Sequence, residues 1–199
     1  VLGLSEVRWK KGDIVSGDVR VIYSGGDKCE KGVAVMLNKE WANRVIAVEQ
    51  KNDRLMWIKL NNEPRNIVIV QVYMPTSAHE DEEIEKMYEE IEEIVDRQKG
   101  SDYVIVMGDL NAVVGEGSDG KEVGKFGLGD RNERGDRLVE FCKGRKFMVS
   151  NTWFEQEKRR RYTWKQPGEL ARYQNDFILV KQRYRNSVKN SRSYPGADI

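Results

Sequence analysis

Two polar residues, Asp109 and Asn111, follow an apolar run that predicts a buried strand. The run covers residues 104–107 (VIVM) and ends at Gly108. Because side chains two residues apart on an extended chain point to the same side, the acid and the amide are expected to lie together. A carboxylate beside an amide can hold a water molecule, remove its proton and stabilise the charge that develops as the water attacks. The alternative is an Asx turn that only closes the strand.

Further candidate residues also stand where strand-like runs end or begin. Glu6 ends the run that opens the chain, Tyr73 ends IVIVQVY, and Asp176 begins DFILV. Thr163 and Trp164 lie in RRRYTWK. The Glu6 carboxylate is a hard oxygen ligand of the kind that Mg²⁺ prefers. A structural role explains any one of these residues alone, whereas their combination and order indicate a site.

The order of these motifs resembles that of the endonuclease/exonuclease/phosphatase superfamily, which includes DNase I, the apurinic/apyrimidinic endonucleases and the endonucleases of LINE retrotransposons. The similarity extends over nearly all 199 residues and is carried by GDLNA, NERGDRLVEFC and RRYTWKQPG. Within the superfamily, the sequence looks most similar to the endonucleases of RTE-type (BovB-like) retrotransposons. It looks equally similar to the captured copy of that domain in craniofacial development (Bucentaur) proteins.

The resemblance implies a DNase I-like α/β fold, a four-layer sandwich of two packed β-sheets flanked by helices, as a single domain over residues 1–199. It also implies Mg²⁺-dependent cleavage of DNA that leaves a 3′-hydroxyl. By match with the superfamily, Asp109 activates the attacking water, while Asn111 helps to orient it and contacts the phosphate. Glu6 ligates the metal, and Tyr73 steadies the scissile phosphate.

The resemblance also assigns roles in the last third of the chain. Thr163 and Trp164 would lie along the DNA backbone and minor groove, and Asp176 would orient a catalytic histidine. In the superfamily that histidine belongs to a closing S-D-H strand, whereas this sequence ends in SYPGADI. Its single histidine, His79, follows VYMPTS in a predicted loop, where we expect it to be solvated.

Both ends of the predicted sandwich depart from the superfamily pattern. The first strand, which carries an Asn near the active site, and the last strand are expected to be missing, so that catalysis is impaired. Losing two core strands would expose sheet edges and apolar surface. We therefore expect either completion by another segment or chain, or self-association.

Charge is balanced overall but unevenly distributed along the chain. The formal net charge is +1, yet residues 80–99 carry a net charge of −7 and residues 158–192 a net charge of +9. The basic segment contains Arg159, Arg160 and Arg161 and is interleaved with tyrosine and tryptophan. Cations interleaved with aromatic rings are typical of nucleic-acid-binding surfaces, so DNA is the expected partner. Two solvated faces are the alternative.

The composition suits one domain with a two-layer core, because 39% of the residues are apolar. No stretch approaches the roughly 18 apolar residues that a membrane span needs, so no membrane association is expected. Cys29 and Cys142 have neither the spacing of a metal site nor the number of a disulfide framework. They indicate a reducing compartment, either nuclear or cytoplasmic.

The hydrophobic pattern predicts more strands than helices. Helices are predicted over residues 84–95, from a continuous apolar stripe, and over residues 134–145. The glycines at 115, 117 and 120 spell G-x-G-x-x-G but open no helix, so they predict a loop rather than a dinucleotide site. Hairpin-paired strands with helices outside them indicate an α+β sandwich. The predicted strands cover residues 33–37, 44–50, 54–60, 67–73, 103–107, 147–150 and 176–180.

Three functions remain open on the sequence. The first is a Mg²⁺-dependent DNA endonuclease domain. The second is a non-catalytic remnant of a captured nuclease, retained for binding nucleic acid or protein. The third, a phosphoinositide or lipid phosphatase of the same fold, is disfavoured because the NERGDRL and RRYTWK segments resemble the DNA-cleaving branch.

Overall fold

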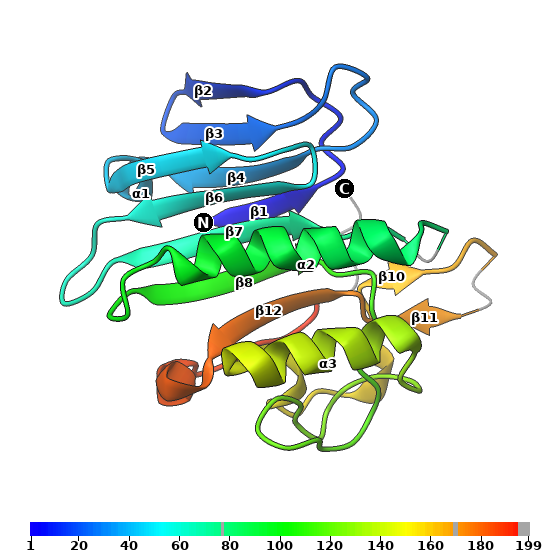
Figure 1. Ribbon diagram of the computed structural model, residues 1–199. Coiled ribbons are helices and arrows are strands. Elements are labelled where there is room, and N and C mark those ends of the chain that lie inside the picture. Colours follow the sequence, from blue (N-terminus) through cyan, green and yellow to red (C-terminus); the bar gives the residue numbers. More distant parts are fainter. Residues whose placement is uncertain (77, 169–170, 195–199) are drawn as a thin grey trace. The chain divides into compact units, whose positions relative to one another are not determined.

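A computed structural model describes residues 1–76, 78–168 and 171–194 of the chain (Figure 1). Contacts divide the chain into two compact units, Val1–Asp109 and Leu110–Ile199. That the two units form one domain stays a prediction. The closing segment SYPGADI lies outside the described residues from position 195 onward. Among the described residues, no helix is both long enough and apolar enough to cross a membrane.

The first unit contains an antiparallel sheet of four strands. The order across the sheet is β1 (Leu2–Ser5), β4 (Val33–Asn38), β3 (Val19–Ser24) and β2 (Gly12–Ser16). The hairpin of β2 and β3 was not predicted, although its turn at Gly17 and Asp18 is a recognised hairpin signal. The short helix α1 (Lys39–Ala42) follows β4, and the Asn38 side chain caps it by accepting a hydrogen bond from the Trp41 amide.

A second sheet in the same unit carries the predicted strand exits. It contains β5 (Val45–Gln50), β6 (Leu55–Leu60), β7 (Ile67–Tyr73) and β8 (Tyr103–Asp109). Neighbouring strands from β5 to β7 pair antiparallel, whereas β7 and β8 pair parallel. Parallel strands require a crossover, which the helix α2 (Asp81–Asp96) provides. As a result, β7 and β8 end at the same edge of the sheet.

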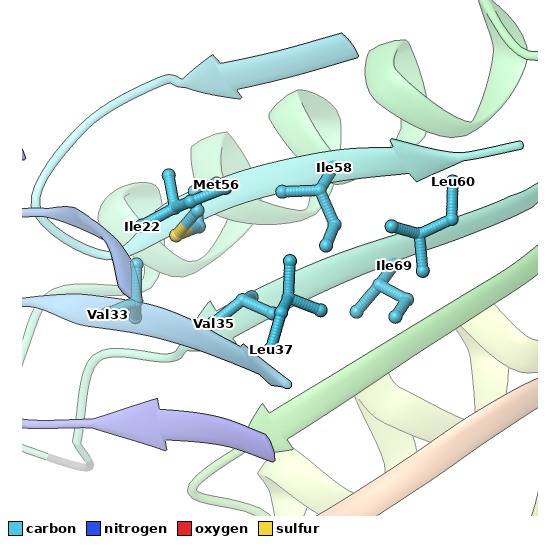
Figure 2. Packing of buried hydrophobic residues seen from close by; sticks show 8 residues of the cluster. All are labelled: Ile22, Val33, Val35, Leu37, Met56, Ile58, Leu60 and Ile69. Atoms are coloured by element: carbon cyan, nitrogen blue, oxygen red, sulfur yellow. The ribbon is translucent and has the colours of Figure 1, made fainter. Parts of the chain in front are cut away.

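The two sheets of the first unit pack face to face through alternate residues of their strands. On β7, the odd-numbered residues face the first sheet, while Val68, Val70 and Val72 are fully buried on the opposite face. Strands buried on both faces explain the nearly continuous apolar runs in the sequence. Figure 2 shows the packed residues of this core, which are Ile22, Val33, Val35, Leu37, Met56, Ile58, Leu60 and Ile69.

The helix α2 lies along the second sheet (Figure 1), and its sequence is amphipathic. Its acidic residues face away from the sheet, which accounts for the negative charge of residues 80–99. The predicted helix is confirmed, with a start three residues earlier at Asp81. The buried stripe consists of Ile84, Met87, Tyr88, Ile91, Ile94 and Val95.

The second unit contains the helix α3 (Glu133–Arg145) and two pairs of strands. The Asn132 side chain caps α3 by accepting a hydrogen bond from the Gly135 amide. The strands β9 (Phe147–Val149) and β12 (Asp176–Lys181) pair antiparallel, as do the short strands β10 (Trp164–Lys165) and β11 (Arg172–Tyr173). Residues 115–129 form no helix, which confirms that the glycine pattern there is a loop. Single 3₁₀ turns cover Ser150–Thr152, Lys158–Arg160 and Gln182–Ser187.

Candidate active site

The ends of β7 and β8 place Tyr73 directly beside Asp109. The two residues are partners in the parallel register, and the Met74 amide donates a 2.8 Å hydrogen bond to the Asp109 carbonyl. Gly108 makes this approach possible, because it has a φ of 136° and a Cβ there would overlap the Val72 carbonyl oxygen. The glycine before the acid therefore has a structural reason, which is close contact with the neighbouring strand.

Glu6 joins the same edge from the first sheet. The Tyr73 hydroxyl donates a 3.0 Å hydrogen bond to Glu6 Oε1, and Arg8 forms a 3.4 Å ion pair with Glu6 Oε2. Glu6 has a left-handed backbone with a φ of 58°, a conformation that costs energy for a residue with a side chain. The first unit thus brings together Glu6, Tyr73 and Asp109, three of the predicted catalytic residues.

The environment of Tyr73 makes its phenol harder to ionise. Partial burial raises the pKa of Tyr73, and the hydrogen bond to the Glu6 carboxylate raises it further because a phenolate would face an anion. Asp109 adds to this effect, whereas the positive charge of Arg54 opposes it. At neutral pH the group is therefore a phenol that can donate a hydrogen bond.

Arg54 is a residue of this site that the sequence analysis missed. Its guanidinium lies 4.8 Å from the centre of the Tyr73 ring and donates a 3.3 Å hydrogen bond to the Tyr73 carbonyl. Pairing the predicted runs 54–60 and 67–73 as a hairpin places Arg54 opposite Tyr73, so a signal was present in the sequence.

The position of His79 corrects the expectation of a solvated loop residue. His79 is half-buried, with Nε2 at 3.2 Å from Nη2 of Arg54 and Nδ1 at 3.0 Å from Oγ1 of Thr76. The expectation failed because Arg54, 25 residues away in the sequence, provides a partner that local composition does not indicate.

The predicted metal ligand, Glu6, is compatible with a weakly held cation. Its side chain is 49% exposed, so that most of a cation's hydration shell could remain in place. Mg²⁺ is often held by one or two carboxylates together with water and substrate phosphate, rather than by a full protein cage. Within the described parts of the chain, no group of three or more histidine, cysteine, aspartate or glutamate side chains forms a metal cage. The donor set therefore fits a hydrated Mg²⁺ better than a tightly bound ion.

The second unit holds Asn111 at its start and Asp176 at the beginning of β12. Asn111 is half-buried and has a left-handed backbone with a φ of 45°. The Leu110 amide beside it donates a 2.9 Å hydrogen bond to the Asn175 carbonyl. Thr163 is part of the same arrangement, because its Oγ1 accepts hydrogen bonds of 3.0 and 3.1 Å from the amides of Asn175 and Asp176.

The carboxyl of Asp176 is partly removed from water although the residue as a whole exposes surface. This desolvation raises the pKa of Asp176, and a hydrogen bond from Thr163 partly offsets the increase. Thr163 therefore has a structural task at the start of β12, which does not depend on a role in binding DNA.

The hairpin of β10 and β11 displays aromatic rings and cations together. Trp164 and Tyr173 are 45% and 36% exposed, and their ring centres lie 5.7 Å apart. Arg172 and Lys165 lie 4.8 and 5.6 Å from the centre of the Tyr162 ring. Exposed rings beside cations can stack on nucleic-acid bases and attract the phosphates.

The three predicted arginine ligands for DNA do not share one environment. Arg159 and Arg160 are exposed, and both pair with the exposed Glu157, at 3.0 and 3.5 Å. Arg161 is 8% exposed, and it donates hydrogen bonds to the carbonyls of Gln156 and Gly127 and pairs with Glu116. This placement corrects the expectation that all three arginines face a polyanion, because the internal acceptors already hold the Arg161 guanidinium.

No protein-family model matches the chain. Craniofacial development protein 2 from Bos taurus is 38% identical over 200 aligned residues, which span 100% of this chain and 34% of that protein. The protein of the same name from Tragulus javanicus is 36% identical, with 100% of this chain and 35% of that protein covered. The chain therefore spans about a third of the length of the curated relatives it matches.

Solved structures share the fold at lower sequence identity. The endonuclease domain of TRAS1, a telomere-specific non-LTR retrotransposon, has a TM-score of 0.59 at 14% identity, with 86% of this chain and 70% of that chain covered. The AP endonuclease LMAP from Leishmania major has a TM-score of 0.63 at 11% identity, with 92% and 70% covered. TDP2 from D. rerio, complexed with a single-strand DNA product, has a TM-score of 0.54 at 14% identity, with 90% and 64% covered.

These likenesses confirm the predicted α/β class with packed sheets and flanking helices, as in DNase I-like nucleases. The chain has the fold of the endonuclease/exonuclease/phosphatase family, and its whole sequence is similar to about one third of craniofacial development protein 2.

Proposed function

We propose that this chain is an endonuclease-like domain of retrotransposon origin that is built for Mg²⁺-dependent cleavage of DNA phosphodiesters. The observation that carries the proposal is the meeting of Glu6, Tyr73 and Asp109 at one edge of the first unit. Two carboxylates and a phenol donor are the groups that hydrolysis of a phosphodiester needs, namely a base, a cation ligand and a donor to the phosphate. The origin is supported by the fold of the TRAS1 endonuclease domain.

In the proposed reaction Asp109 removes a proton from water, whose oxygen attacks phosphorus as the bond to the 3′ oxygen breaks. Asn111 orients the water, and Tyr73 donates a hydrogen bond to a phosphate oxygen in place of Glu6. The products are a 3′-hydroxyl and a 5′-phosphate, with the 3′ oxygen taking up a proton. Glu6 would hold the Mg²⁺, which when bound supplies positive charge against the phosphate.

DNA is the proposed substrate, and the hairpin of β10 and β11 is the proposed surface for it. Trp164, Tyr173, Lys165 and Arg172 combine rings with cations, and Arg159 and Arg160 add exposed positive charge. TDP2, a protein of the same fold, is seen with a single-strand DNA product, which supports DNA as the class of ligand. Thr163 and Trp164 remain the proposed contacts to the backbone and minor groove.

We further propose that these 199 residues cleave slowly on their own. The chain has one histidine, and His79 is engaged by Arg54 and Thr76. No histidine is then left to meet the negative charge that develops on the phosphate, and losing such a group typically costs about 10²- to 10⁴-fold in rate.

Relaxation of supercoiled plasmid in millimolar Mg²⁺ tests the proposed activity. We expect slow nicking that requires Mg²⁺ and that Asp109→Asn lowers by at least about 10²-fold, because the amide cannot accept the proton. Glu6→Gln should raise the Mg²⁺ concentration needed for half of the maximal rate. Nicking at the same rate by Asp109→Asn would remove Asp109 as the base.

The second candidate is a non-catalytic domain that binds nucleic acid or protein. It is favoured by the engagement of the single histidine, and by apolar surface on edge strands, where Val15 on β2 is 72% exposed and Ile46 on β5 is 55% exposed. Such edges could also support self-association or pairing with another segment. Tight DNA binding together with no Mg²⁺-dependent nicking would favour this candidate over the first.

A further inference from the structure

Arg54 is a buried cation that forms no ion pair within the described residues, although Asp53, Glu83 and Glu90 line the same pocket. The residue is 6% exposed, and no ion pair to a described aspartate or glutamate involves it. Burying a guanidinium without an anion is costly unless its N–H groups find acceptors. The acceptors available to it are the Tyr73 carbonyl, the face of the Tyr73 ring and Nε2 of His79.

The chemistry of arginine decides which nitrogen of His79 carries the proton. A guanidinium can only donate hydrogen bonds, so Nε2 of His79 must accept and must be unprotonated. The remaining proton of a neutral imidazole then sits on Nδ1, which donates to Oγ1 of Thr76 at 3.0 Å. A doubly protonated imidazole would place a second cation 3.2 Å from the buried guanidinium.

We propose that Arg54 and His79 are positioning residues for Tyr73, with His79 neutral, protonated on Nδ1, and holding the Arg54 guanidinium against the Tyr73 ring. The link runs from Thr76 through His79 and Arg54 to the ring whose hydroxyl contacts Glu6. A guanidinium packed over the Tyr73 ring restricts where the ring can lie, and it therefore restricts the position of the hydroxyl that contacts Glu6. The effect on cleavage rests on the proposed nuclease function, whereas the arrangement itself does not.

A single histidine makes the tautomer directly measurable. In a ¹⁵N-labelled sample of the 199-residue chain, long-range ¹H–¹⁵N correlation spectra contain the imidazole of His79 and no other. We expect Nδ1 to show the shift of a protonated nitrogen and Nε2 that of an unprotonated one at neutral pH. A proton on Nε2, or two protonated nitrogens, would overturn the proposal.

Variants of the neighbours test whether the link reaches Tyr73. Tyr73→Leu removes the ring, and Arg54→Met removes the donor, so both should shift the two nitrogen signals toward the values of a histidine in a peptide. Tyr73→Phe keeps the ring and should leave the signals in place. Thr76→Val is a milder test, because it removes only the acceptor of the Nδ1 proton. It should shift the Nδ1 signal more than the Nε2 signal. Signals unchanged by Tyr73→Leu in a folded sample would show that Tyr73 is not part of the link.

Plasmid nicking tests the consequence for the site. His79→Ala should lower the rate about tenfold, because a loosened Tyr73 is misplaced relative to the phosphate. His79→Gln should restore most of the rate, since its Oε1 can accept from Arg54 while alanine cannot. Equal rates for the alanine and glutamine variants would contradict the positioning role. If the parent chain does not nick DNA at all, the nuclease proposal fails, and the nitrogen spectra still decide the inference.

Discussion

The Tyr73 hydroxyl donates a 3.0 Å hydrogen bond to Oε1 of Glu6, across 67 residues of sequence. This contact joins the end of β7 in one sheet to the residue that follows β1 in the other. The contact keeps two proposed functional groups together. One is the Glu6 carboxylate, the proposed metal ligand, and the other is the Tyr73 phenol, the proposed hydrogen-bond donor to the phosphate. A phosphate oxygen that replaces Glu6 as the acceptor would take over an already oriented donor.

Removing the Tyr73 hydroxyl should weaken cleavage without harming the fold. Tyr73→Phe keeps the ring under Arg54 but loses the donor, so we expect plasmid nicking to fall by about 10- to 10²-fold. Tyr103→Phe is the matched control, because Tyr103 lies at the opposite end of β8 from Asp109. Equal losses in the two variants would exclude a specific role for the Tyr73 hydroxyl.

Arg159, Arg160 and Arg161 should differ in their effects: Arg161 should contribute to stability, and the two exposed arginines to DNA binding. Arg161→Ala breaks hydrogen bonds to two carbonyls and a pair with Glu116, so it should lower the free energy of unfolding by about 2 kcal/mol. Arg159→Ala with Arg160→Ala should leave stability within about 0.5 kcal/mol. The double variant at Arg159 and Arg160 should reduce the slope of log affinity for DNA against log salt by up to about 0.9 for each lost phosphate contact. Urea denaturation and fluorescence anisotropy measure the two effects, and an unchanged slope would remove both arginines from the interface.

The exposed rings of the β10–β11 hairpin should contribute to binding single-stranded DNA. Trp164→Ala and Tyr173→Ala should each weaken binding by about 1–3 kcal/mol, which is the typical contribution of one stacked base. Tyr194→Ala serves as the control, because Tyr194 is 76% exposed but lies outside the hairpin. Anisotropy titrations with a labelled oligonucleotide would measure the change, and unaltered affinity in both hairpin variants would place the DNA elsewhere.

Gly108 should tolerate no side chain. Gly108→Ala places a methyl group against the Val72 carbonyl at a φ of 136°, and we expect a loss of at least about 2 kcal/mol in the free energy of unfolding. Gly144→Ala in α3 is the control, since a methyl group there meets open space and alanine favours helix by about 0.5–1 kcal/mol. Thermal denaturation should shift down for the first variant and up for the second. A wild-type melting temperature for Gly108→Ala would show that β7 and β8 can separate without cost.

Asp176 should destabilise the folded chain at neutral pH. Its pKa is raised in the folded state, so the folded chain binds the proton more tightly than the unfolded chain does. The free energy of unfolding therefore falls as the pH rises from the ordinary value of 3.8 through the raised pKa, and the cost is complete above it. Asp176→Asn should be more stable than the parent at pH 7, with the difference disappearing below pH 3.8. An advantage of the same size at both pH values would attribute the effect to packing rather than to charge.

The sequence by itself determined the two longer helices and most of the longer strands, but not the hairpin of β2 and β3, and it showed where polar residues leave the strands. The stripe from Ile84 to Val95 requires an amphipathic helix, and the apolar runs around Val70 and Val106 indicate strands, because the spacing of apolar residues is a local property. The same periodicity placed Tyr73 and Asp109 at strand ends. The fold class followed from these elements together with the order of the motifs.

Only the tertiary structure decided which polar groups face each other. Whether Arg161 meets solvent or the Gly127 carbonyl, and whether His79 is solvated or bound to Arg54, depends on partners 34 and 25 residues away. The charge of a side chain is visible in the sequence, but its acceptor is chosen by the pairing of strands and the path of loops. For the same reason the contact between Tyr73 and Glu6 arises from the packing of one sheet on the other, a long-range event that no local pattern encodes.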